Sequence, residues 1–368
     1  MAHIVDKGSA SRLRWKVRYR TTGGQARSRA FPSKAQAQSF ATAIESQRAA
    51  GSLVDPKRGR LTFGEWVERW HRMPSTLRPS SIARDNSYLG HRVLPHFSGF
   101  RLCDVTTHEI QTWADGLNAS TRLAPASVHK SVQVLSKVLA SAVRDGRLSY
   151  NPARGVVLPP LPDTEARFLT SDELLRLEDA MPPRWAVLVP FLADVGLRIG
   201  EVAALRWEDV DTQSGRVRVR QTYVEVQGRG IFSAPKTRAG RRVVPMLTPE
   251  IGSRMEGLRS APTDLVFQGA KGGPLRPNAW RARVWRPAIA AAQLAAPLPT
   301  PHSLRHTAVA HWIAAGVEPF KLAVFAGHAS VSTLYRVYGH LLDTDANAER
   351  VALSALRAAA RRRRTSGL

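Results

Sequence analysis

The stretch GLRIGEVAALRWEDVD occupies residues 196–211 and decides the interpretation of the largest part of the chain. It places Arg198 in a glycine-flanked turn directly before an amphipathic helix, where a planar guanidinium can reach a phosphate. Glu201 follows three residues later and can hold that guanidinium or another basic group. A single arginine of this kind is more often a surface or capping residue, so the interpretation needs support from elsewhere.

The segment HSLRH (302–306) puts His302 and Arg305 three residues apart, which brings both side chains to one face of a predicted helix. His306 lies four residues after His302, as in zinc metalloproteases, but Ser303 stands where such a site needs a glutamate. We therefore expect no metal here. Taken alone, a helix-end histidine beside a surface arginine is the plainer interpretation.

The next segment, AGHASVSTLYRVYGH (326–340), contains His328, Tyr335 and Tyr338. A tyrosine can attack a phosphodiester if neighbouring cations or a base help to remove its proton, because its ordinary pKa is about 10. Most tyrosines are instead packing residues whose hydroxyl has a hydrogen-bond partner. Either phenol is thus a candidate nucleophile with a structural alternative.

A lysine able to donate a proton to a departing alkoxide is the remaining candidate. Lys236 lies in SAPKTRAGRRVVPM (233–246), in a turn-like segment between two predicted strands. Lys271, in AKGGP, is the alternative with less strand context around it. Lysines in such turns are usually only solvated, so neither is assigned by its surroundings alone.

The composition indicates a nucleic-acid partner. The 368 residues include 54 Lys plus Arg against 29 Asp plus Glu, a formal net charge of +25, and basic residues are in excess in 1–60, 61–160 and 161–368 alike. Because neutralised phosphates release counterions, this distribution suits a modular DNA-binding protein, whereas a membrane-surface protein would concentrate its charge in one amphipathic segment. A single cysteine, Cys103, and the lack of a signal-like or membrane-spanning stretch lead us to expect a cytoplasmic protein.

The N-terminal part, 1–55, predicts a small sheet backed by a helix. In RWKVRYR (14–20), apolar and aromatic residues alternate with cations, a turn at 22–24 leads to a second strand, and a helix follows from 33 to about 51. A basic sheet face can enter a DNA groove, although a solvated outer face is the plainer alternative. The candidate DNA contacts are Arg14, Lys16, Arg18, Arg20, Arg27 and Arg29.

Beyond a polar linker at 52–60, residues 61–155 predict a bundle of about four helices. Its helix starts are marked by Thr62 with Glu65, Thr106 with Glu109, and Pro125. A proline-rich linker at 156–168 leads to the largest part, 165–368, where Thr170 with Glu173 opens a helix. Short antiparallel strands are predicted there at 216–220, 222–226 and 241–246. The fold class is multidomain, mainly α with small antiparallel β-sheets.

Together these signals have a specific order: Arg, Lys, His-x-x-Arg, His and Tyr, across one part of a strongly basic chain. In this the sequence resembles the tyrosine recombinase family, particularly phage-type integrases. GLRIGE is similar to the family's first-arginine box, HSLRHT to its His-x-x-Arg box, and AGH followed by YGH to its final box. The departures are Ala326, where the family often has leucine, and Tyr335, where other residue types are usual.

The resemblance implies a role for each candidate residue. Arg198 and Arg305 would clamp the phosphate, Lys236 would be the general acid, and Tyr338 would be the nucleophile in preference to Tyr335. His302 and His328 would contact the phosphate or handle protons, and Glu201 would support the first arginine. It also implies an arm-type DNA-binding domain at 1–55, a helical core-binding domain at 61–155, and a mixed α+β catalytic domain with a C-terminal tail at 165–368.

The function that the resemblance implies is site-specific recombination of double-stranded DNA through a covalent 3′-phosphotyrosine, integrating or excising a mobile element such as a prophage. No metal, cofactor or ATP would take part, and a homotetramer on DNA is expected, since exchange needs four strand cuts. An excision directionality factor and a DNA-bending protein are further partners to consider, and no membrane is expected. The alternatives are a type IB topoisomerase, a metal-dependent transposase or nuclease, and a DNA-binding protein without enzymatic activity.

Overall fold

The computed structural model divides the chain into two compact units, Met1–Asp163 and Thr164–Leu368. The division falls within the predicted linker at 156–168. Lys236, most of the linker at 52–60, the turn residues 22–23 and the tail from 343 onward lie outside the described residues. The described residues are 2–8, 12–20, 24, 26–49, 58–120, 123–162, 165–235, 237–328 and 330–341.

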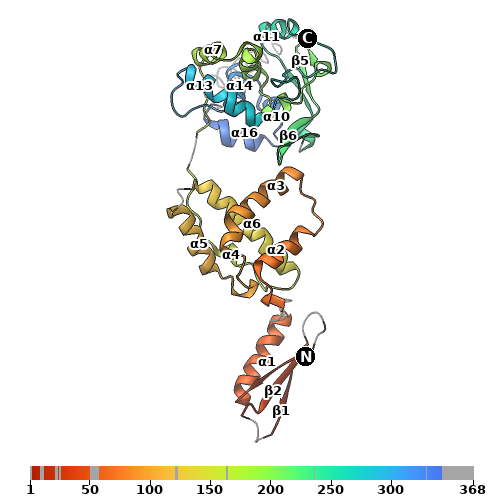
Figure 1. Ribbon diagram of the computed structural model, residues 1–368, viewed down its shortest axis with the longest axis vertical. Helices are drawn as coiled ribbons and strands as arrows, with labels where there is room; N and C mark the ends of the chain where they lie inside the picture. Colours follow the sequence, from red (N-terminus) through yellow and green to blue (C-terminus); the bar gives the residue numbers. More distant parts are fainter. Residues whose placement is uncertain are drawn as a thin grey trace, which may run out of the picture. The chain divides into compact units, whose positions relative to one another are not determined.

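The first segment of the chain is a three-stranded antiparallel sheet with one helix (Figure 1). The sequence predicts the helix and two of these strands, but not the first strand. Its elements are β1 (His3–Asp6), β2 (Trp15–Arg20), β3 (Ala26–Phe31) and α1 (Lys34–Ala49), with β2 in the centre of the sheet. The buried residues of β2, Val17 and Tyr19, pack with Ala37, Ala41 and Ile44 of α1. The alternation in the sequence therefore separates an inner face from a charged outer face.

The strand register divides the six candidate cations between the two faces of the sheet. Arg29 pairs with Val17 and Arg27 with Tyr19, so both arginines of β3 lie on the face that α1 covers. The Arg29 guanidinium lies 5.3 Å from the ring centroid of Phe40. Lys16, Arg18 and Arg20 remain on the outer face, opposite Ala30, Ser28 and Ala26 of β3.

Arg14 is already engaged in an ion pair, because its guanidinium donates to both carboxylate oxygens of Asp6 at 2.7–3.0 Å. This ion pair joins the start of β2 to the end of β1.

Four helical runs make up residues 61–155, which agrees with the predicted bundle. The bounds are α2 (Phe63–His71), α3 (Pro79–Tyr88) continued through a π-helical turn into α4 (Leu94–Phe97), α5 (Thr107–Ser120) and α6 (Pro125–Arg144). The capping box of Thr62 and Glu65 is formed, and Thr106 accepts the backbone N–H of Glu109. Trp66 of α2 is fully buried and donates its indole N–H to the carbonyl of Val138 on α6.

The second unit is mainly helical. Its helices are α7 (Ser171–Asp179), α8 (Pro183–Ala186), α9 (Leu188–Val195), α10 (Ile199–Val202), α11 (Pro249–Glu256), α12 (Pro277–Trp280), α13 (Arg286–Ala291), α14 (Pro301–Ala314), α15 (Pro319–Ala326) and α16 (Val331–Tyr338). The predicted capping box of Thr170 and Glu173 begins α7. Within the described ranges, no helix of the chain is long and apolar enough to cross a membrane.

The strands predicted in this unit are present, but they belong to two separate sheets. β4 (Val210–Asp211), β5 (Arg216–Val219) and β8 (Arg242–Pro245) form one antiparallel sheet, and β6 (Thr222–Val226) pairs with β7 (Arg229–Ser233) in a hairpin. β7 was not predicted. Its residues Arg229 and Gly230 are polar or small, so it lacks the alternation that marks the other strands.

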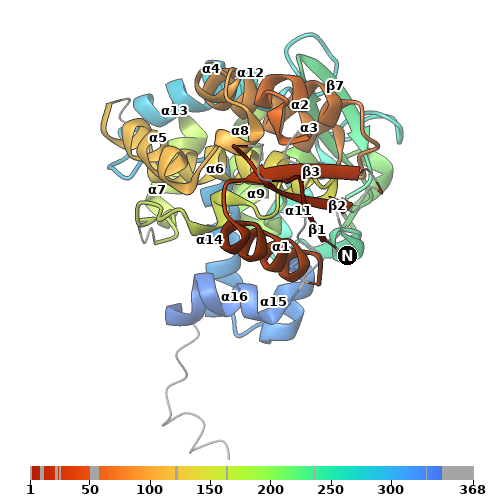
Figure 2. The same ribbon diagram turned by 90° about the horizontal axis from the view of Figure 1, so that it is seen from below.

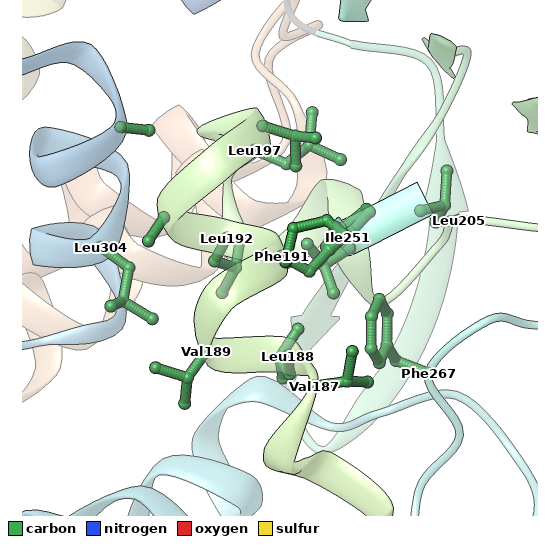
Figure 3. Packing of buried hydrophobic residues seen from close by; sticks show 14 of the residues in the cluster. Val187, Leu188, Val189, Phe191, Leu192, Leu197, Leu205, Ile251, Phe267 and Leu304 are labelled. Atoms are coloured by element: carbon green, nitrogen blue, oxygen red, sulfur yellow. The ribbon is translucent and has the colours of Figure 1, made fainter. Parts of the chain in front are cut away.

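The core of the second unit lies around α9 and α14, whose apolar side chains interdigitate. Figure 3 shows Val189 and Leu192 of α9 on the side of Leu304 of α14, and Phe191 on the other side of α9, towards Phe267. The two helices come close at Gly196, where an added Cβ would lie 2.9 Å from the ring of Trp312. This close packing fixes α14, which carries the HSLRH segment, against the turn that leads to Arg198.

Candidate active site

The site begins where α9 ends. Gly196 has a φ of 58°, a left-handed conformation that costs glycine little, and it turns the chain so that its carbonyl accepts a 2.6 Å hydrogen bond from Arg305. Two residues later Arg198 caps α10, with 42% of its side chain exposed. The glycine-flanked turn of the sequence thus places one arginine at the surface and holds the other in the interior.

The carboxylate of Glu201 is the anchor of this turn. It accepts four hydrogen bonds: from the backbone N–H of Arg198 at 2.9 Å, from the Arg198 side chain at 3.0 Å, and from both terminal nitrogens of Arg242 at 3.0 and 2.9 Å. Burial opposes the charged form, but the hydrogen bonds and charge of Arg242, helped by the charge of Arg198, outweigh it and lower the pKa of Glu201 to about 2. The group is a carboxylate at any working pH.

Three arginines converge on the end of α15. They donate to three successive backbone carbonyls: Arg242 to Phe325 at 2.7 Å, Arg305 to Ala326, and Arg198 to Gly327 at 3.3 Å. A helix end leaves such carbonyls without partners and carries partial negative charge, so cations are favoured there. Gly327 ends the helix with a φ of 61°, and α14, α15 and α16 lie together (Figure 2).

Arg305 is the innermost of the three, with only 2% of its surface exposed. Burial, followed by the charges of Arg198 and Arg242, lowers the pKa of Arg305 to about 9, so it stays charged at neutral pH. Its second terminal nitrogen also lies 3.4 Å from Nε2 of His328.

Both predicted histidines of the site are neutral at pH 7. Partial removal from water, followed by nearby positive charge that includes Arg305, lowers the pKa of His302 and that of His328 to about 4. Nδ1 of His328 is buried and has no hydrogen-bond partner among the described residues. His302 is exposed at the start of α14. A neutral imidazole keeps one ring N–H, so each histidine has a single donor to offer.

Tyr338, the predicted nucleophile, is in the interior, with 1% of its surface exposed. Its hydroxyl forms a 2.7 Å hydrogen bond with Nδ1 of His306, and the ring of Phe168 lies 6.3 Å away, centroid to centroid. Burial raises the pKa of Tyr338 to about 12, although the charge of Arg305 acts in the opposite direction. Tyr335 is 53% exposed, one turn earlier on α16.

Sequence reasoning missed two residues of this site. His306 was considered only as a zinc ligand, whereas in the structure it forms a hydrogen bond with the phenol of Tyr338. Arg242 was not singled out, although it lies in a predicted strand. In that strand Arg242 and Val244 are buried and Val243, between them, is exposed. A charged residue at an inward strand position is rarely unpaired, and that signal could have found it.

The arrangement can bind and polarise a phosphodiester. Arg198 and Arg242 share the carboxylate of Glu201, and Arg305 lies beside them, which leaves two unbalanced positive charges next to two neutral imidazoles. Fixed donors of this kind stabilise charge that grows during a reaction, because they need no reorganisation at that moment.

Two family models match the chain. The model described as "Phage integrase family" matches residues 167–345, and "Phage integrase, N-terminal SAM-like domain" matches residues 62–118. Together they cover nearly two thirds of the chain and include every predicted catalytic residue.

Curated relatives and solved structures agree with these matches. Prophage integrase IntR of Escherichia coli is 26% identical over 83% of this chain and 82% of its own length, and the putative prophage phiRv2 integrase of Mycobacterium tuberculosis is 25% identical over 89% and 88%. The fold is similar to that of the Tn1549 transposon integrase in complex with a circular intermediate DNA (TM-score 0.68, 18% identity, 80% and 99% covered). It is also similar to a lambda integrase tetramer bound to a Holliday junction (TM-score 0.58, 17% identity, 86% and 91% covered).

Proposed function

The chain belongs to the phage integrase family of tyrosine recombinases and is a site-specific recombinase that breaks and rejoins DNA, and we propose that it does so through a covalent 3′-phosphotyrosine at Tyr338. The proposed outcome is integration or excision of a mobile element such as a prophage. The observation that carries the proposal is the gathering of Arg198, Arg305 and His328 around the end of α15, with Tyr338 on the next helix.

The proposed phosphate ligands are Arg198 and Arg305, with His302 and His328 as additional donors. A phosphodiester carries one negative charge, and this charge grows towards two as a phenolate attacks. The two unbalanced positive charges of the cluster therefore match the transition state better than the bound substrate. Binding of the phosphate also offsets the arginine charges, which raises the pKa of the histidines towards the range in which they can move protons.

In the proposed reaction the phenol of Tyr338 gives its proton to a neutral imidazole of the site, its oxygen forms a bond to phosphorus, and the bond from phosphorus to the 5′ oxygen breaks. Lys236, which lies outside the described residues, would give a proton to that oxygen. The phosphoester is retained in the protein–DNA intermediate, so a 5′-hydroxyl of the partner duplex can reseal the strand without ATP.

The nucleophile must move before it can react. With 1% of its surface exposed and its hydroxyl bonded to His306, Tyr338 cannot touch a phosphate on the protein surface. We therefore propose that α16 shifts when DNA is bound and releases the phenol from His306. The arginines, in contrast, are already in place for the phosphate.

For the rest of the chain, we propose an arm-type DNA-binding domain at 1–55, a core-binding domain at 61–155 and a catalytic domain at 165–368. On the arm-type domain, the outer-face cations Lys16, Arg18 and Arg20 lie opposite small side chains of β3, which leaves a flat basic face for a DNA groove. Replacing these three by alanine should weaken arm-site binding and its salt dependence. Arg29→Ala, on the inner face, should lower stability instead.

The proposed assembly is a homotetramer on double-stranded DNA, as four strand cuts need four nucleophiles. An excision directionality factor, a DNA-bending protein and a cytoplasmic location remain parts of the proposal. Two DNA-binding modules in tandem raise the effective concentration at the second site, which suits an integrase with distinct attachment sites.

A suicide substrate, in which the cleaved strand cannot be resealed, tests the chemistry. The wild type should form a covalent complex and Tyr338→Phe should form none, while Tyr335→Phe serves as the matched control and should keep it. A complex that persists in Tyr338→Phe would move the nucleophile. Loss of cleavage in EDTA would point to a metal-dependent nuclease, binding without adduct to a non-enzymatic protein, and relaxation of supercoils without paired sites to a type IB topoisomerase.

A further inference from the structure

Arg242, beside the end of α15, donates to protein atoms from all three of its guanidinium nitrogens. It lies on β8, and only 2% of its side chain is exposed. Its Nε donates to the carbonyl of Phe325, one terminal nitrogen to Glu201 and to the carbonyl of Gly240 at 3.2 Å, and the other to Glu201. These bonds use four of its five N–H groups, and the fifth is buried with the rest of the side chain, so Arg242 presents no donor at the surface for DNA. Its contribution to the reaction must therefore pass through its partners.

Those partners lead directly to two phosphate-binding side chains. Glu201 holds both the backbone and the side chain of Arg198. Phe325 belongs to the last turn of α15, three residues before His328. Arg242 also packs against Gly327, where an added Cβ would meet its guanidinium carbon at 3.1 Å.

We infer that Arg242 is a positioning residue of the recombination site, which aligns Arg198 through Glu201 and aligns His328 through the last turn of α15. This inference rests on the proposed function for the roles of Arg198 and His328. Its physical basis is that a bidentate guanidinium fixes a carboxylate in plane as well as in distance. Since a misplacement of about 1 Å can cost about 10²-fold in rate, loss of that alignment should be visible in cleavage.

The first test compares Arg242→Gln and Arg242→Lys with the wild type on a suicide core-site duplex. At saturating DNA, Arg242→Gln should form the covalent complex on the order of 10²-fold more slowly, with a DNA dissociation constant within about threefold of the wild type. Arg242→Lys, which keeps the charge but not the planar fork, should fall in between.

Arg276→Gln is the matched control. Arg276 also donates to a largely buried carboxylate, Glu225, at 2.9 Å, and to a backbone carbonyl, that of Gly228, at 2.7 Å. Among the described residues these hydrogen bonds reach none of the proposed site residues, so the cleavage rate per folded molecule of Arg276→Gln should be unchanged. Equal slowing of Arg276→Gln and Arg242→Gln would overturn the inference.

Arg242→Gln leaves a buried carboxylate short of its partner and can unfold the protein. The double variant Glu201→Gln/Arg242→Gln removes both charges, so it should fold, which circular dichroism would verify. It should still cleave slowly, because an amide pair does not fix Arg198. Wild-type cleavage by a folded double variant would overturn the inference.

A pH profile separates positioning from general stability. Glu201 is faced by Arg198 of α10, Arg242 of β8, and Arg305 and His302 of α14. Without Arg242, burial favours the neutral carboxyl, so cleavage by Arg242→Gln should fall as the pH drops from 8 to 6 more steeply than in the wild type, and the double variant should lose this extra slope. Identical profiles for all three would overturn the inference. A wild type that forms no adduct at Tyr338 would instead reject the proposed function, so the two failures are distinguishable.

Discussion

The polar groups at the end of α15 and those on the next helix, α16, differ in how firmly hydrogen bonds hold them. At the end of α15, three arginines bind three consecutive carbonyls, and two of them also share the carboxylate of Glu201. On α16, the hydroxyl of Tyr338 has one hydrogen-bond partner among the described residues, His306. The groups proposed to bind the phosphate are thus fixed in advance, whereas the side chain proposed as the nucleophile is held by a single hydrogen bond.

This difference fits the order of events in a cleavage reaction. Charge stabilisation is effective only if the donors do not reorganise, so the arginines are best built into the fold. A nucleophile that is always exposed could cut DNA before a complex is assembled.

The largest effect is expected from the buried arginine. Arg305→Gln keeps a hydrogen-bonding side chain for the carbonyl of Gly196 but removes the charge, so formation of the covalent complex should slow by about 10²–10³-fold. Quench-flow or gel assays on a suicide duplex at saturating DNA measure this. Loss of DNA affinity with a normal cleavage rate would contradict it, since it would make Arg305 a general DNA contact.

A pair of glycine variants compares the two regions directly. Gly327→Ala puts a Cβ on a left-handed residue, 3.1 Å from Arg242 and 3.2 Å from the carbonyl of Ala239, and should cost about 2 kcal/mol or more of unfolding free energy. Gly339→Ala, directly after Tyr338, meets nothing within 4 Å and should change stability by less than about 0.5 kcal/mol. Urea unfolding measures both; equal losses would show that the end of α15 is not the more rigid region.

Much of this site could be predicted from the sequence, for a physical reason. Capping boxes such as Thr170 with Glu173, and the Arg198 turn with Glu201, depend on neighbours within four residues, which a local pattern shows. The partners of Arg242 and His306 lie 41 and 32 residues away, so their pairing exists only after the chain has folded. The same holds for the N-terminal sheet, where composition shows the cations but only the strand register shows which face each of them occupies.

Removing the hydrogen bond between His306 and Tyr338 should speed cleavage, whereas changes at the arginines slow it. His306→Leu removes the hydrogen-bond partner of Tyr338 and leaves its hydroxyl unsatisfied in the buried position, at a cost of about 1 kcal/mol or more. If release of the phenol limits cleavage, the covalent complex should form about fivefold faster than in the wild type. His311→Leu, which replaces an exposed histidine further along the same helix, is the control. A slower reaction would show instead that His306 accepts the proton of Tyr338 during attack.

The smallest effect is expected from the neutral histidines, in the stability of the free protein. His302 and His328 have pKa values of about 4 in the fold against 6.5 in the unfolded chain, so the unfolded state binds more protons between these values. Their contribution is complete above pH 6.5 and is lost as the pH falls towards 4, and the thermal midpoint should fall with it. His328→Gln should flatten this slope between pH 6.5 and 5. Below about pH 4.5 the loss of stability should continue. In that range the unfolded chain binds a proton at Glu201, whereas the folded protein, in which the pKa of Glu201 is about 2, does not. A bound core-site duplex should also flatten the slope, since its phosphate raises the pKa of both histidines; an unchanged slope with DNA would place the phosphate away from the end of α15.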